Sequence, residues 1–456
     1  MKSILLIILC LIGFSFTGIG QKTKTNNTAY PVRPKGQENV LELRCPPMDS
    51  VRIGIIGVGM RGIGAVSRFK FLEKVRLVAI CDVREEFAKR AQDTLFKTNR
   101  PPAILYTGTE DWKKVCERND IDLIYICTPW YLHTPIAVYA MNHGKHVAVE
   151  VPAATTVEEC WQLVNTSEKT RKHCMMLENC CYDFFEMTTL NLAQKGKLGT
   201  LVHGEGAYIH DLRTLLFDTT QNGYYDMWRL KYHTEHTGNP YATHGLGPIA
   251  QAFNIHRGDR MKYLVSVSSE QFGLTEYAKQ KFGSNSKMAQ TDYKLGDMSS
   301  TLIKTQNGKT ILLQHNVTNP GPYSRLQIVY GTKGFAQKYP IEGYAFDPAG
   351  HEFLTNEKAE AIKSEYEHPI ITEIGKIAKE VNGNGHGGID FIMDYRLMYC
   401  LRNGLPLDHD VYDAAEWSCI GELSEISAKN GGIPVEIPDF TRGDWNKLKS
   451  VNFHQK

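Results

Sequence analysis

Residues 228–245, WRLKYHTEHTGNPYATHG, contain side chains that can move protons and hold oxygen atoms. His244 exchanges a proton near neutral pH, which suits a general base. The phenol of Tyr241, three residues earlier, can donate to an oxyanion or act as a base if its pKa is lowered. Arg229 offers a rigid fork of N–H donors. The three residues predict an acid–base site, although a tyrosine beside glycine and proline is also a common packing residue.

A metal site is the alternative interpretation of this segment, because it also contains His233, His236 and His244. Their spacing does not place the three imidazoles on one face of a helix, and no acidic residue has a matching spacing. We therefore predict no metal. The eleven cysteines of the chain are scattered, contain no C-x-x-C pair and are interpreted mainly as small core residues.

A second set of residues predicts a phosphate-binding turn. In VRIGIIGVGMRGIGAV, an apolar run is followed by Gly57, Gly59 and Gly62 in G-x-G-x-x-G spacing. The first glycine allows a tight turn, the second lets a pyrophosphate approach the backbone, and the third lets the following helix pack closely. The phosphates would bind at the N-terminus of that helix, where free N–H groups favour anions.

An acidic residue supports this interpretation. The next apolar run, VRLVAICD, ends in Asp82, 20 residues after Gly62. A carboxylate at this point accepts hydrogen bonds from the adenosine ribose and repels a 2′-phosphate. The two features together predict a dinucleotide site that takes NAD as its cofactor, whereas the glycine pattern alone would also fit an ordinary turn.

The elements that position these residues alternate between strand and helix. DWKKVCERND and HTPIAVYAMNHG are predicted helices, and IDLIYICTP and KHVAVEVP are predicted buried strands. This alternation is typical of a doubly wound parallel sheet, which binds its ligand beyond the carboxyl ends of the strands. Gly57, Asp82, Thr128 and Glu150 lie at such ends, so we expect them to meet in one crevice.

The pattern changes from about residue 172. MMLENCCYDFF is predicted to form another strand and a turn, and it is followed by a helix in MTTLNLAQKGKLG. The runs YLVSVSSEQF, SSTLIKT, KTILLQHNV and SRLQIVYGT have few helices between them, which favours a largely antiparallel sheet. We therefore predict an α/β protein in which a Rossmann domain (residues 49–175) precedes an α+β domain with an open sheet and C-terminal helices (residues 176–456).

Composition and the N-terminus narrow the partners. Lys and Arg number 52 and Asp and Glu number 50, a net charge of +2 that argues against a nucleic-acid partner. Residues 1–20 have the charged start, apolar run and small residues of a signal peptide, too short to span a membrane. We expect an exported protein with no membrane span, whose residues 21–48 form a polar, exposed leader.

The elements GIIGVGMRG, AICD, ICTPWYLH and KHVAVE-P resemble the Gfo/Idh/MocA oxidoreductase superfamily. That superfamily normally has Glu-Lys-Pro in the last motif, with a lysine that assists proton transfer, whereas Val151 stands at this position here. The segments EVPA, MMLENCCY, NPYATHGLGP, NPGPYSR and GHGGIDFIMDYRLMYCLRNGLPLDHDVYDAAEWS are similar to one branch, glycoside hydrolase family 109, over nearly all of the chain from residue 49. That branch includes NAD-dependent α-N-acetylgalactosaminidases.

The motifs and the resemblance together imply the residues of two sites. The predicted cofactor residues are Gly57, Gly59, Met60, Arg61, Gly62, Asp82, Trp130, Tyr131, Leu132, His133, Glu150, Val151 and Asn179. The predicted substrate residues are Tyr208, Arg229, Tyr241, Ala242, Thr243, His244 and Tyr323, with His244 and Tyr241 as the catalytic pair and Tyr182 as a further candidate for proton transfer. For Glu150, the alternative to contact with the cofactor is a structural role at the end of a strand.

Export and NAD binding together favour a cofactor that is reduced and reoxidised within one cycle, because little free NAD exists outside the cytoplasm. The resemblance implies such a cycle: a hydride leaves C3 of the sugar, the resulting ketone acidifies the C2 proton, the C1 substituent is eliminated, water adds and the hydride returns. The expected substrate is a glycan or glycoside ending in N-acetylgalactosamine. The alternatives are a sugar oxidoreductase with tightly bound NAD and a non-catalytic sugar-binding protein. We also expect that the open sheet can pair two copies of the chain.

Overall fold

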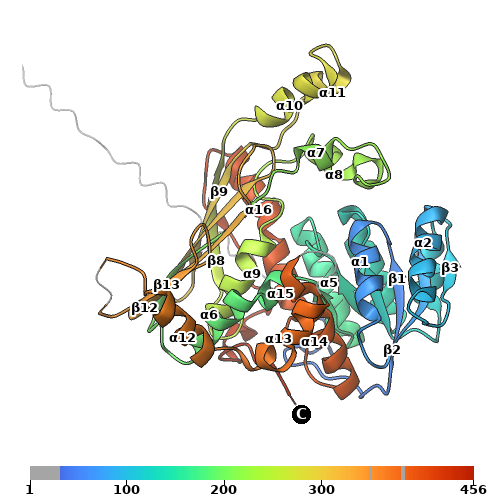
Figure 1. The fold of residues 1–456 in the computed structure, drawn as a ribbon, viewed down its shortest axis with the longest axis horizontal. Helices are drawn as coiled ribbons and strands as arrows, with labels where there is room; N and C mark the ends of the chain where they lie inside the picture. Colours follow the sequence, from blue (N-terminus) through green and yellow to red (C-terminus); the bar gives the residue numbers. More distant parts are fainter. Residues whose placement is uncertain (1–30, 349–350, 382–385, 456) are drawn as a thin grey trace, which may run out of the picture.

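A computed structural model describes residues 31–348, 351–381 and 386–455. The first domain contains a six-stranded parallel sheet with the strand order β3-β2-β1-β4-β5-β6 (Figure 1). Its strands are β1 (Val51–Ile56), β2 (Val75–Cys81), β3 (Ile104–Tyr106), β4 (Leu123–Ile126), β5 (His146–Val149) and β6 (Cys174–Met176). All four residues of β4 and of β5 are buried, which explains their uninterrupted apolar runs.

Five helices connect these strands: α1 (Met60–Phe69), α2 (Glu85–Phe96), α3 (Asp111–Glu117), α4 (His133–Asn142) and α5 (Val157–Thr170), with the short helix η1 (Trp130–Leu132) before α4. This is the doubly wound arrangement that the alternating pattern predicted. Each βα turn opens at the carboxyl end of its strand, so the loops after β1, β2, β4 and β5 lie at one edge of the sheet.

The boundary between the two domains differs from the prediction. The predicted boundary between residues 175 and 176 falls inside strand β6. The change of pattern had grouped the strand in MMLENCCYDFF with the second domain, but β6 pairs in parallel with β5, Val149 being opposite Met176. The parallel sheet therefore has a sixth strand, and the turn after it also opens at the ligand edge. A strand of three residues is too short for its sequence to reveal whether its partners are parallel or antiparallel.

The second domain contains an eight-stranded sheet with the order β13-β12-β11-β7-β10-β9-β8-β14. Its strands are β7 (Leu201–Ile209), β8 (Met261–Ser268), β9 (Ser299–Thr305), β10 (Thr310–Asn316), β11 (Ser324–Gly331), β12 (Gly334–Gln337), β13 (Gly343–Phe346) and β14 (Val435–Glu436). Every pair is antiparallel except β7 with β10. The predicted largely antiparallel sheet is confirmed.

The helices of this domain pack mainly on the face of the sheet that is turned toward the first domain (Figure 1). They are α6 (Phe184–Gln194), α7 (Arg213–Leu216), α8 (Trp228–Tyr232), α9 (Thr243–Ala252), α10 (Gly273–Phe282), α11 (Lys287–Gln290), α12 (Asn356–Glu365), α13 (Pro369–Glu380), α14 (Ile389–Asn403), α15 (Val411–Ser418) and α16 (Ile420–Lys429). The short helices are η2 (Asn179–Tyr182), η3 (Tyr225–Met227), η4 (His386–Gly388) and η5 (Asp444–Asn446).

Glycines let α9 approach β7 very closely. A Cβ atom on Gly206 would lie 2.3 Å from the carbonyl oxygen of Gly245, and one on Gly204 would lie 2.7 Å from the side chain of Ile249. This contact fixes the first turn of α9, which carries His244, against the centre of the sheet. The part of the chain that directly follows the histidine is therefore packed closely against the sheet.

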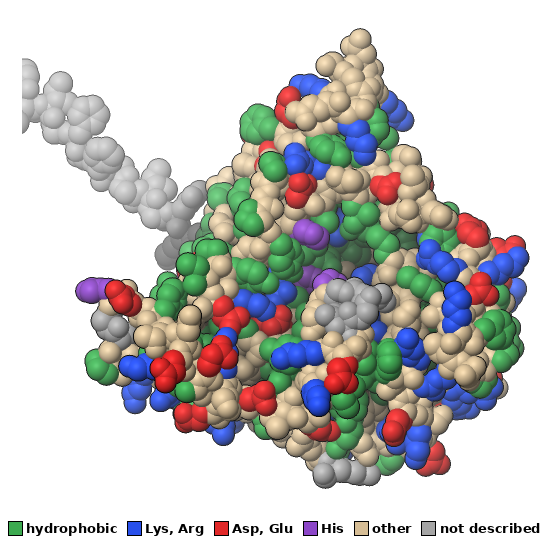
Figure 2. Space-filling model, in the orientation of Figure 1, with side chains coloured by type: hydrophobic (Ala, Val, Ile, Leu, Met, Phe, Trp, Pro, Cys, Tyr) green, Lys and Arg blue, Asp and Glu red, His purple; other side chains and the backbone are tan. Residues whose placement is uncertain are grey.

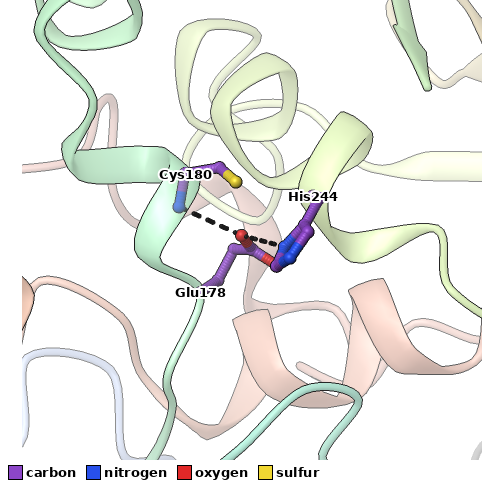
Figure 3. A group of neighbouring side chains, drawn as sticks. All are labelled: Glu178, Cys180 and His244. Carbon is purple, nitrogen blue, oxygen red and sulfur yellow. Dashed lines mark hydrogen bonds and ion pairs between the residues drawn. The ribbon is translucent and has the colours of Figure 1, made fainter. Parts of the chain in front are cut away.

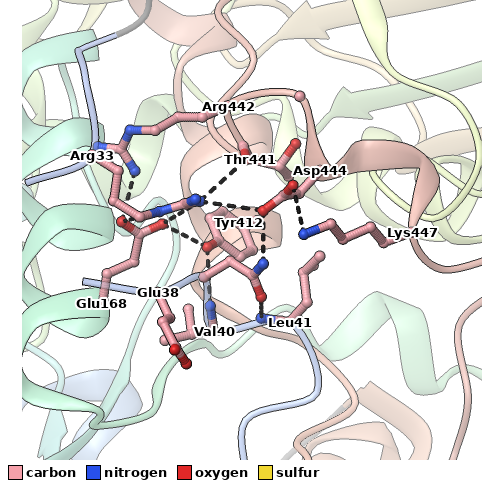
Figure 4. Close-up of polar contacts among 12 residues, drawn as sticks. Arg33, Glu38, Val40, Leu41, Glu168, Tyr412, Thr441, Arg442, Asp444 and Lys447 are labelled. Atoms are coloured by element: carbon pink, nitrogen blue, oxygen red, sulfur yellow. Dashed lines mark hydrogen bonds and ion pairs between the residues drawn. The ribbon is translucent and has the colours of Figure 1, made fainter. Parts of the chain in front are cut away.

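The described part of the leader, residues 31–48, is mostly exposed, but several of its side chains anchor it to the rest of the chain. Arg33 forms an ion pair of 3.2 Å with the buried Glu168 of α5, and Asn39 donates to Asp444. Val40 is buried and its backbone N–H donates to the hydroxyl of Tyr412 (Figure 4). The segment thus ties α5 to the C-terminal part of the chain.

The predicted signal peptide, residues 1–20, lies outside the described residues. Among the helices that are described, none combines the length and the apolar character needed to cross a membrane. All the cysteines that the structure describes are free, and all of these except Cys45 and Cys127 are buried.

Candidate functional site

A cavity of about 580 Å³ lies between the carboxyl edge of the parallel sheet and the helical face of the second domain. Figure 2 shows a hollow near the centre of the molecular face, with histidine side chains at its edge. Most of the predicted site residues line this cavity: Gly57, Gly59, Met60, Arg61, Asp82, Trp130, Tyr131, Leu132, His133, Glu150, Val151, Asn179, Tyr208, Arg229, Tyr241 and His244. Gly62, Ala242, Thr243, Tyr323 and Tyr182 are not among its lining residues.

The geometry at the three glycines of the turn fits the roles that their spacing predicts. Gly57 has φ +86, a conformation that favours glycine, and a Cβ atom there would lie 2.6 Å from the carbonyl oxygen of Cys127. A Cβ atom on Gly62 would lie 2.0 Å from the carbonyl oxygen of Gly57, so only glycine allows α1 to start here. At Gly59 the nearest atom is a side-chain nitrogen of Arg84 at 3.4 Å, which leaves the backbone open to a phosphate.

Asp82 shapes this turn as well as lining the cavity. Its Oδ2 accepts from the backbone N–H of Val58 at 2.8 Å, and its Oδ1 accepts from that of Arg84 at 2.9 Å. Each carboxylate oxygen has a second lone pair, so the group can still accept a hydrogen bond from a ribose hydroxyl. The turn and Asp82 therefore fit the adenosine half of NAD.

His244 is held by a carboxylate that the sequence analysis did not identify (Figure 3). Its Nδ1 lies 2.7 Å from Oε1 and 2.9 Å from Oε2 of the buried Glu178. Burial raises the pKa of Glu178, but the charge and hydrogen bonds of His244 outweigh burial, and the pKa is below its usual range. An ionised Glu178 can only accept, so Nδ1 carries the proton and Nε2 is left as the nitrogen that can take one.

Aromatic rings surround Arg229 beside this histidine. Its guanidinium lies 4.7 Å from the ring centre of Tyr241 and 5.0 Å from that of Trp130, and one of its nitrogens donates to the hydroxyl of Tyr224 at 3.0 Å. Arg229 is only 4% exposed, and none of the described acidic residues forms an ion pair with it. Its Nε and Nη2 make no hydrogen bond to any described residue. A ligand that accepts hydrogen bonds would satisfy these donors.

The two phenols next to His244 act as donors. The rings of Tyr208 and Tyr241 lie 5.4 and 4.9 Å from the imidazole of His244, and their centres are 4.6 Å apart. Burial raises the pKa of both phenols. The sequence analysis allowed Tyr241 to act as a base if its pKa were lowered, but the shift has the opposite direction. Both hydroxyls therefore remain protonated near neutral pH.

Tyr323 lies beside this group, outside the cavity lining. It is 39% exposed, its ring is 6.4 Å from that of Tyr208, and its hydroxyl accepts from Arg325 at 3.3 Å. Arg325 is in turn paired with Asp183 and Glu186. Tyr323 is therefore a neighbour of the cavity residue Tyr208 and does not itself line the cavity.

The structure does not support the proton-transfer role that the sequence analysis considered for Tyr182. Its ring is fully buried and packs on His409 and Phe453, and its hydroxyl donates to Asp408 at 3.2 Å. The turn after β6 points Asn179 toward the cavity and continues as η2, which carries Tyr182 into the core. Ala242 and Thr243 belong to the start of α9 and are also buried.

The position of the missing lysine is filled by an apolar side chain. Val151 lines the cavity and is only 4% exposed. The neighbouring Glu150 accepts from Nε of Arg61 at 2.9 Å, so its carboxylate is engaged with the glycine turn. His133 does not substitute for the amine, because its two nitrogens lie 2.7 and 2.8 Å from the carbonyl oxygens of Pro152 and Thr128.

The sequence analysis missed several residues of the site. Glu178 lies just past the carboxyl end of β6, and the rule that ligands bind beyond such ends would have identified it had β6 been assigned to the first sheet. Tyr224, Trp228, His210 and His386 line the cavity and were not predicted. Trp228 and His386 lie in segments quoted above, but no spacing distinguished them from their neighbours.

Comparisons with known proteins give the same division of the chain. Residues 51–178 match the family model described as the oxidoreductase family, NAD-binding Rossmann fold, and residues 182–447 match glycosyl hydrolase 109, C-terminal domain. A protein of Bacteroides fragilis named alpha-N-acetylgalactosaminidase is 56% identical over 417 residues, which cover 91% of this chain and 98% of the relative. A glycosyl hydrolase family 109 protein of Porphyromonas gingivalis is 52% identical over 92% of this chain and 90% of the relative.

Solved structures share the fold at low sequence identity. Levoglucosan dehydrogenase in complex with NADH and L-sorbose has a TM-score of 0.64 at 18% identity and covers 86% of this chain and 100% of its own. The WlbA dehydrogenase of Bordetella pertussis in complex with NADH and UDP-GlcNAcA has a TM-score of 0.60 at 14% identity, covering 86% of this chain and 99% of its own. The predicted two-domain fold is thereby confirmed.

Proposed function

Because this chain belongs to glycosyl hydrolase family 109, a family of glycoside hydrolases built on an NAD-binding fold, we propose that it hydrolyses α-N-acetylgalactosaminides without net oxidation. The observation that carries this proposal is the pair His244–Glu178, which places a general base in the same cavity as the dinucleotide turn. The relative of this chain that is named alpha-N-acetylgalactosaminidase supports the choice of sugar.

When bound, NAD supplies a nicotinamide that takes a hydride from C3 of the sugar and returns it at the end of the cycle. Nε2 of His244 accepts the proton of the C3 hydroxyl, and Glu178 stabilises the imidazolium that forms. The resulting C3 ketone acidifies the C2 proton. A base takes this proton while the C1 substituent leaves and is protonated to the free alcohol or phenol, and water then adds across the C1–C2 double bond, with its OH on C1 and a proton on C2. Two carboxylates at a fixed separation, the usual arrangement in glycosidases, are not required.

Donors around the cavity stabilise the negative oxygen of this intermediate. Tyr208 and Tyr241 keep their hydroxyl protons because burial raises the pKa of both. Arg229 contributes two N–H groups that have no partner among the described residues. Preorganised donors in a buried site stabilise developing charge more strongly than water does. Val151 provides no proton, so the cycle rests on His244 and these donors.

The test is a set of aryl α-N-acetylgalactosaminides incubated with purified protein and no added NAD. Hydrolysis predicts release of the phenol over many turnovers, with no accumulation of reduced nicotinamide. A sugar oxidoreductase would instead accumulate reduced nicotinamide or require a second sugar. Absence of phenol release from every α-N-acetylgalactosaminide would overturn the proposal.

We also propose that the chain is exported, on the basis of the charged, apolar and small residues in its first 20 positions. A cofactor that is regenerated within each cycle suits a compartment with little free NAD. Cell fractionation tests this proposal, which predicts the shortened protein outside the cytoplasm. Recovery of the full-length chain from the cytoplasm would contradict it.

Two copies of the chain are proposed to pair through the open face of the second sheet. Val267 of β8, Leu302 of β9 and Tyr330 of β11 project from this face and are 57%, 48% and 40% exposed. An exposed apolar face of this kind is typical of an interface between proteins. Light scattering should give twice the mass of one chain, and the mass of a single chain at high concentration would contradict pairing.

A further inference from the structure

Asp390 reaches from the C-terminal half of the chain into the cofactor side of the cavity. It lies in the first turn of α14 and is only 5% exposed. Its Oδ1 accepts from Nη2 of Arg61 at 3.1 Å and from Nδ2 of Asn179 at 2.6 Å. Its Oδ2 lies 3.4 Å from Nη1 of Arg61 and 3.0 Å from Nδ1 of His386.

Arg61 is the centre of this arrangement. It lies at the start of α1, lines the cavity, and is held between two carboxylates from different parts of the chain. Glu150, at the end of β5, accepts from its Nε at 2.9 Å, and Asp390 accepts from its two Nη atoms. A guanidinium held by carboxylates on two sides has little freedom to change its direction.

Asn179 depends on the same carboxylate. It lines the cavity from η2, and its side-chain NH₂ donates to Oδ1 of Asp390. This hydrogen bond determines which end of the amide is turned toward the cavity. Asp390 therefore orients two cavity residues, Arg61 and Asn179, although it is absent from the cavity lining itself.

We infer that Asp390 is a positioning residue of the NAD site: through Arg61 and Asn179, helix α14 holds the cofactor side of the cavity in shape and slows release of the cofactor. Asp390 makes the site depend on contacts between the two halves of the chain. The inference concerns NAD alone, so it stands or fails independently of which sugar is hydrolysed.

The same helix provides a matched control. Asp394, one turn further along α14, accepts from Nε of Arg68 at 2.7 Å and from the hydroxyl of Tyr125 at 2.8 Å. This ion pair also joins α14 to α1, but neither Asp394 nor Arg68 lines the cavity. If the α14 contacts only stabilised the fold, replacing either aspartate would change the affinity for NAD to the same extent.

The experiment compares wild type, Asp390→Asn and Asp394→Asn as purified full-length proteins. NAD content is measured after acid release, and NAD affinity is measured by calorimetry on the NAD-free proteins, whose folding is checked by circular dichroism. Asp390→Asn is expected to lower the NAD content and to weaken the affinity about tenfold, the effect of one lost charge-assisted contact. Asp394→Asn is expected to lower the unfolding temperature and to bind NAD with wild-type affinity.

A double-mutant cycle with Arg61→Gln tests the route of the effect. The Arg61→Gln single variant changes neither aspartate and should itself bind NAD more weakly than wild type. If Asp390 acts mainly through Arg61, adding Asp390→Asn to Arg61→Gln should change NAD affinity by less than twofold. Wild-type NAD affinity in Asp390→Asn, an equal loss in Asp394→Asn, or a fully additive double variant would each overturn the inference.

Discussion

Glu178 determines the chemistry of His244. Its carboxylate accepts the Nδ1 proton at 2.7 Å and is itself fully buried, so the imidazole has one orientation and one tautomer. The backbone N–H of Cys180 donates to the same carboxylate at 3.1 Å and fixes it from the other side. A histidine alone in the cavity would have neither constraint.

Replacing Glu178 by Gln should therefore lower the rate of hydrolysis by roughly 10²- to 10⁴-fold, because the amide can hold His244 in the wrong tautomer and cannot stabilise an imidazolium. NAD content should stay at the wild-type level, since Glu178 does not line the cavity. Phenol release and cofactor content of the same preparation measure both effects.

Glu235, an exposed residue nine positions before His244, offers a matched control: Glu235→Gln should leave the rate of hydrolysis unchanged. Full activity in Glu178→Gln would show that the carboxylate has no part in the proton transfer.

The residues of the site could be predicted where they belong to a motif. The three glycines, Asp82 and His244 have types and spacings that follow from turn geometry and proton chemistry, and the structure brings all but Gly62 to the cavity wall. Tyr182 could not be separated from its neighbour Asn179 in this way. The direction of η2 depends on packing, which the order of residues does not reveal.

At the scale of the elements, Gly59 and Gly62 have different roles in the turn between β1 and α1. Gly62 lets α1 start against the carbonyl oxygen of Gly57, whereas Gly59 keeps a space that nothing in the described protein fills. The first is a packing requirement and the second is a ligand requirement. Alanine substitutions separate them because each adds a single methyl group.

Gly59→Ala should weaken NAD binding by at least about tenfold, because the methyl group occupies the space of the pyrophosphate, and should leave the unfolding temperature of the NAD-free protein unchanged. Gly62→Ala should lower both, since its Cβ atom would lie 2.0 Å from a carbonyl oxygen and α1 must move. Calorimetry with NAD and thermal unfolding of the NAD-free proteins give the two readings. Equal behaviour of the two variants would refute this division of roles.

The elements themselves were predictable to different degrees. Buried strands such as β4 and β5 are read from their uninterrupted apolar runs, and the helices between them from their periodicity. The sequence did not predict the pairing of β6 with β5 or the parallel pairing of β7 with β10, because the residues of a strand do not indicate the direction of its partner.

Across the whole molecule, buried ion pairs join segments that are distant in the sequence. Glu168 of α5 accepts from Arg33 of the leader, from Arg442 near the C-terminus and from the hydroxyl of Tyr412 (Figure 4). The described part of the leader therefore has a structural role, which its polar composition concealed. Contacts between such distant positions could not be inferred from a single sequence.

Replacing Glu168 by Gln should reduce the free energy of unfolding by about 3 kcal/mol, because two guanidinium groups lose a buried counter-ion. In the same cluster, Lys447→Gln removes an exposed ion pair with Asp444 and should cost less than about 1 kcal/mol. Chemical denaturation of the two variants at equal NAD saturation measures the difference. Equal stabilities would mean that the leader contact adds nothing to the fold.

The central claim is that the two halves of the molecule enclose a hydride that leaves the sugar and returns to it within one turnover. It is tested most directly with an aryl α-N-acetylgalactosaminide that carries deuterium at C3, hydrolysed in parallel with the unlabelled substrate, and with the unlabelled substrate hydrolysed in deuterated water. The account predicts slower phenol release from the C3-deuterated substrate and deuterium from the solvent at C2 of the released sugar. Equal rates together with a C2 position free of solvent deuterium would contradict it.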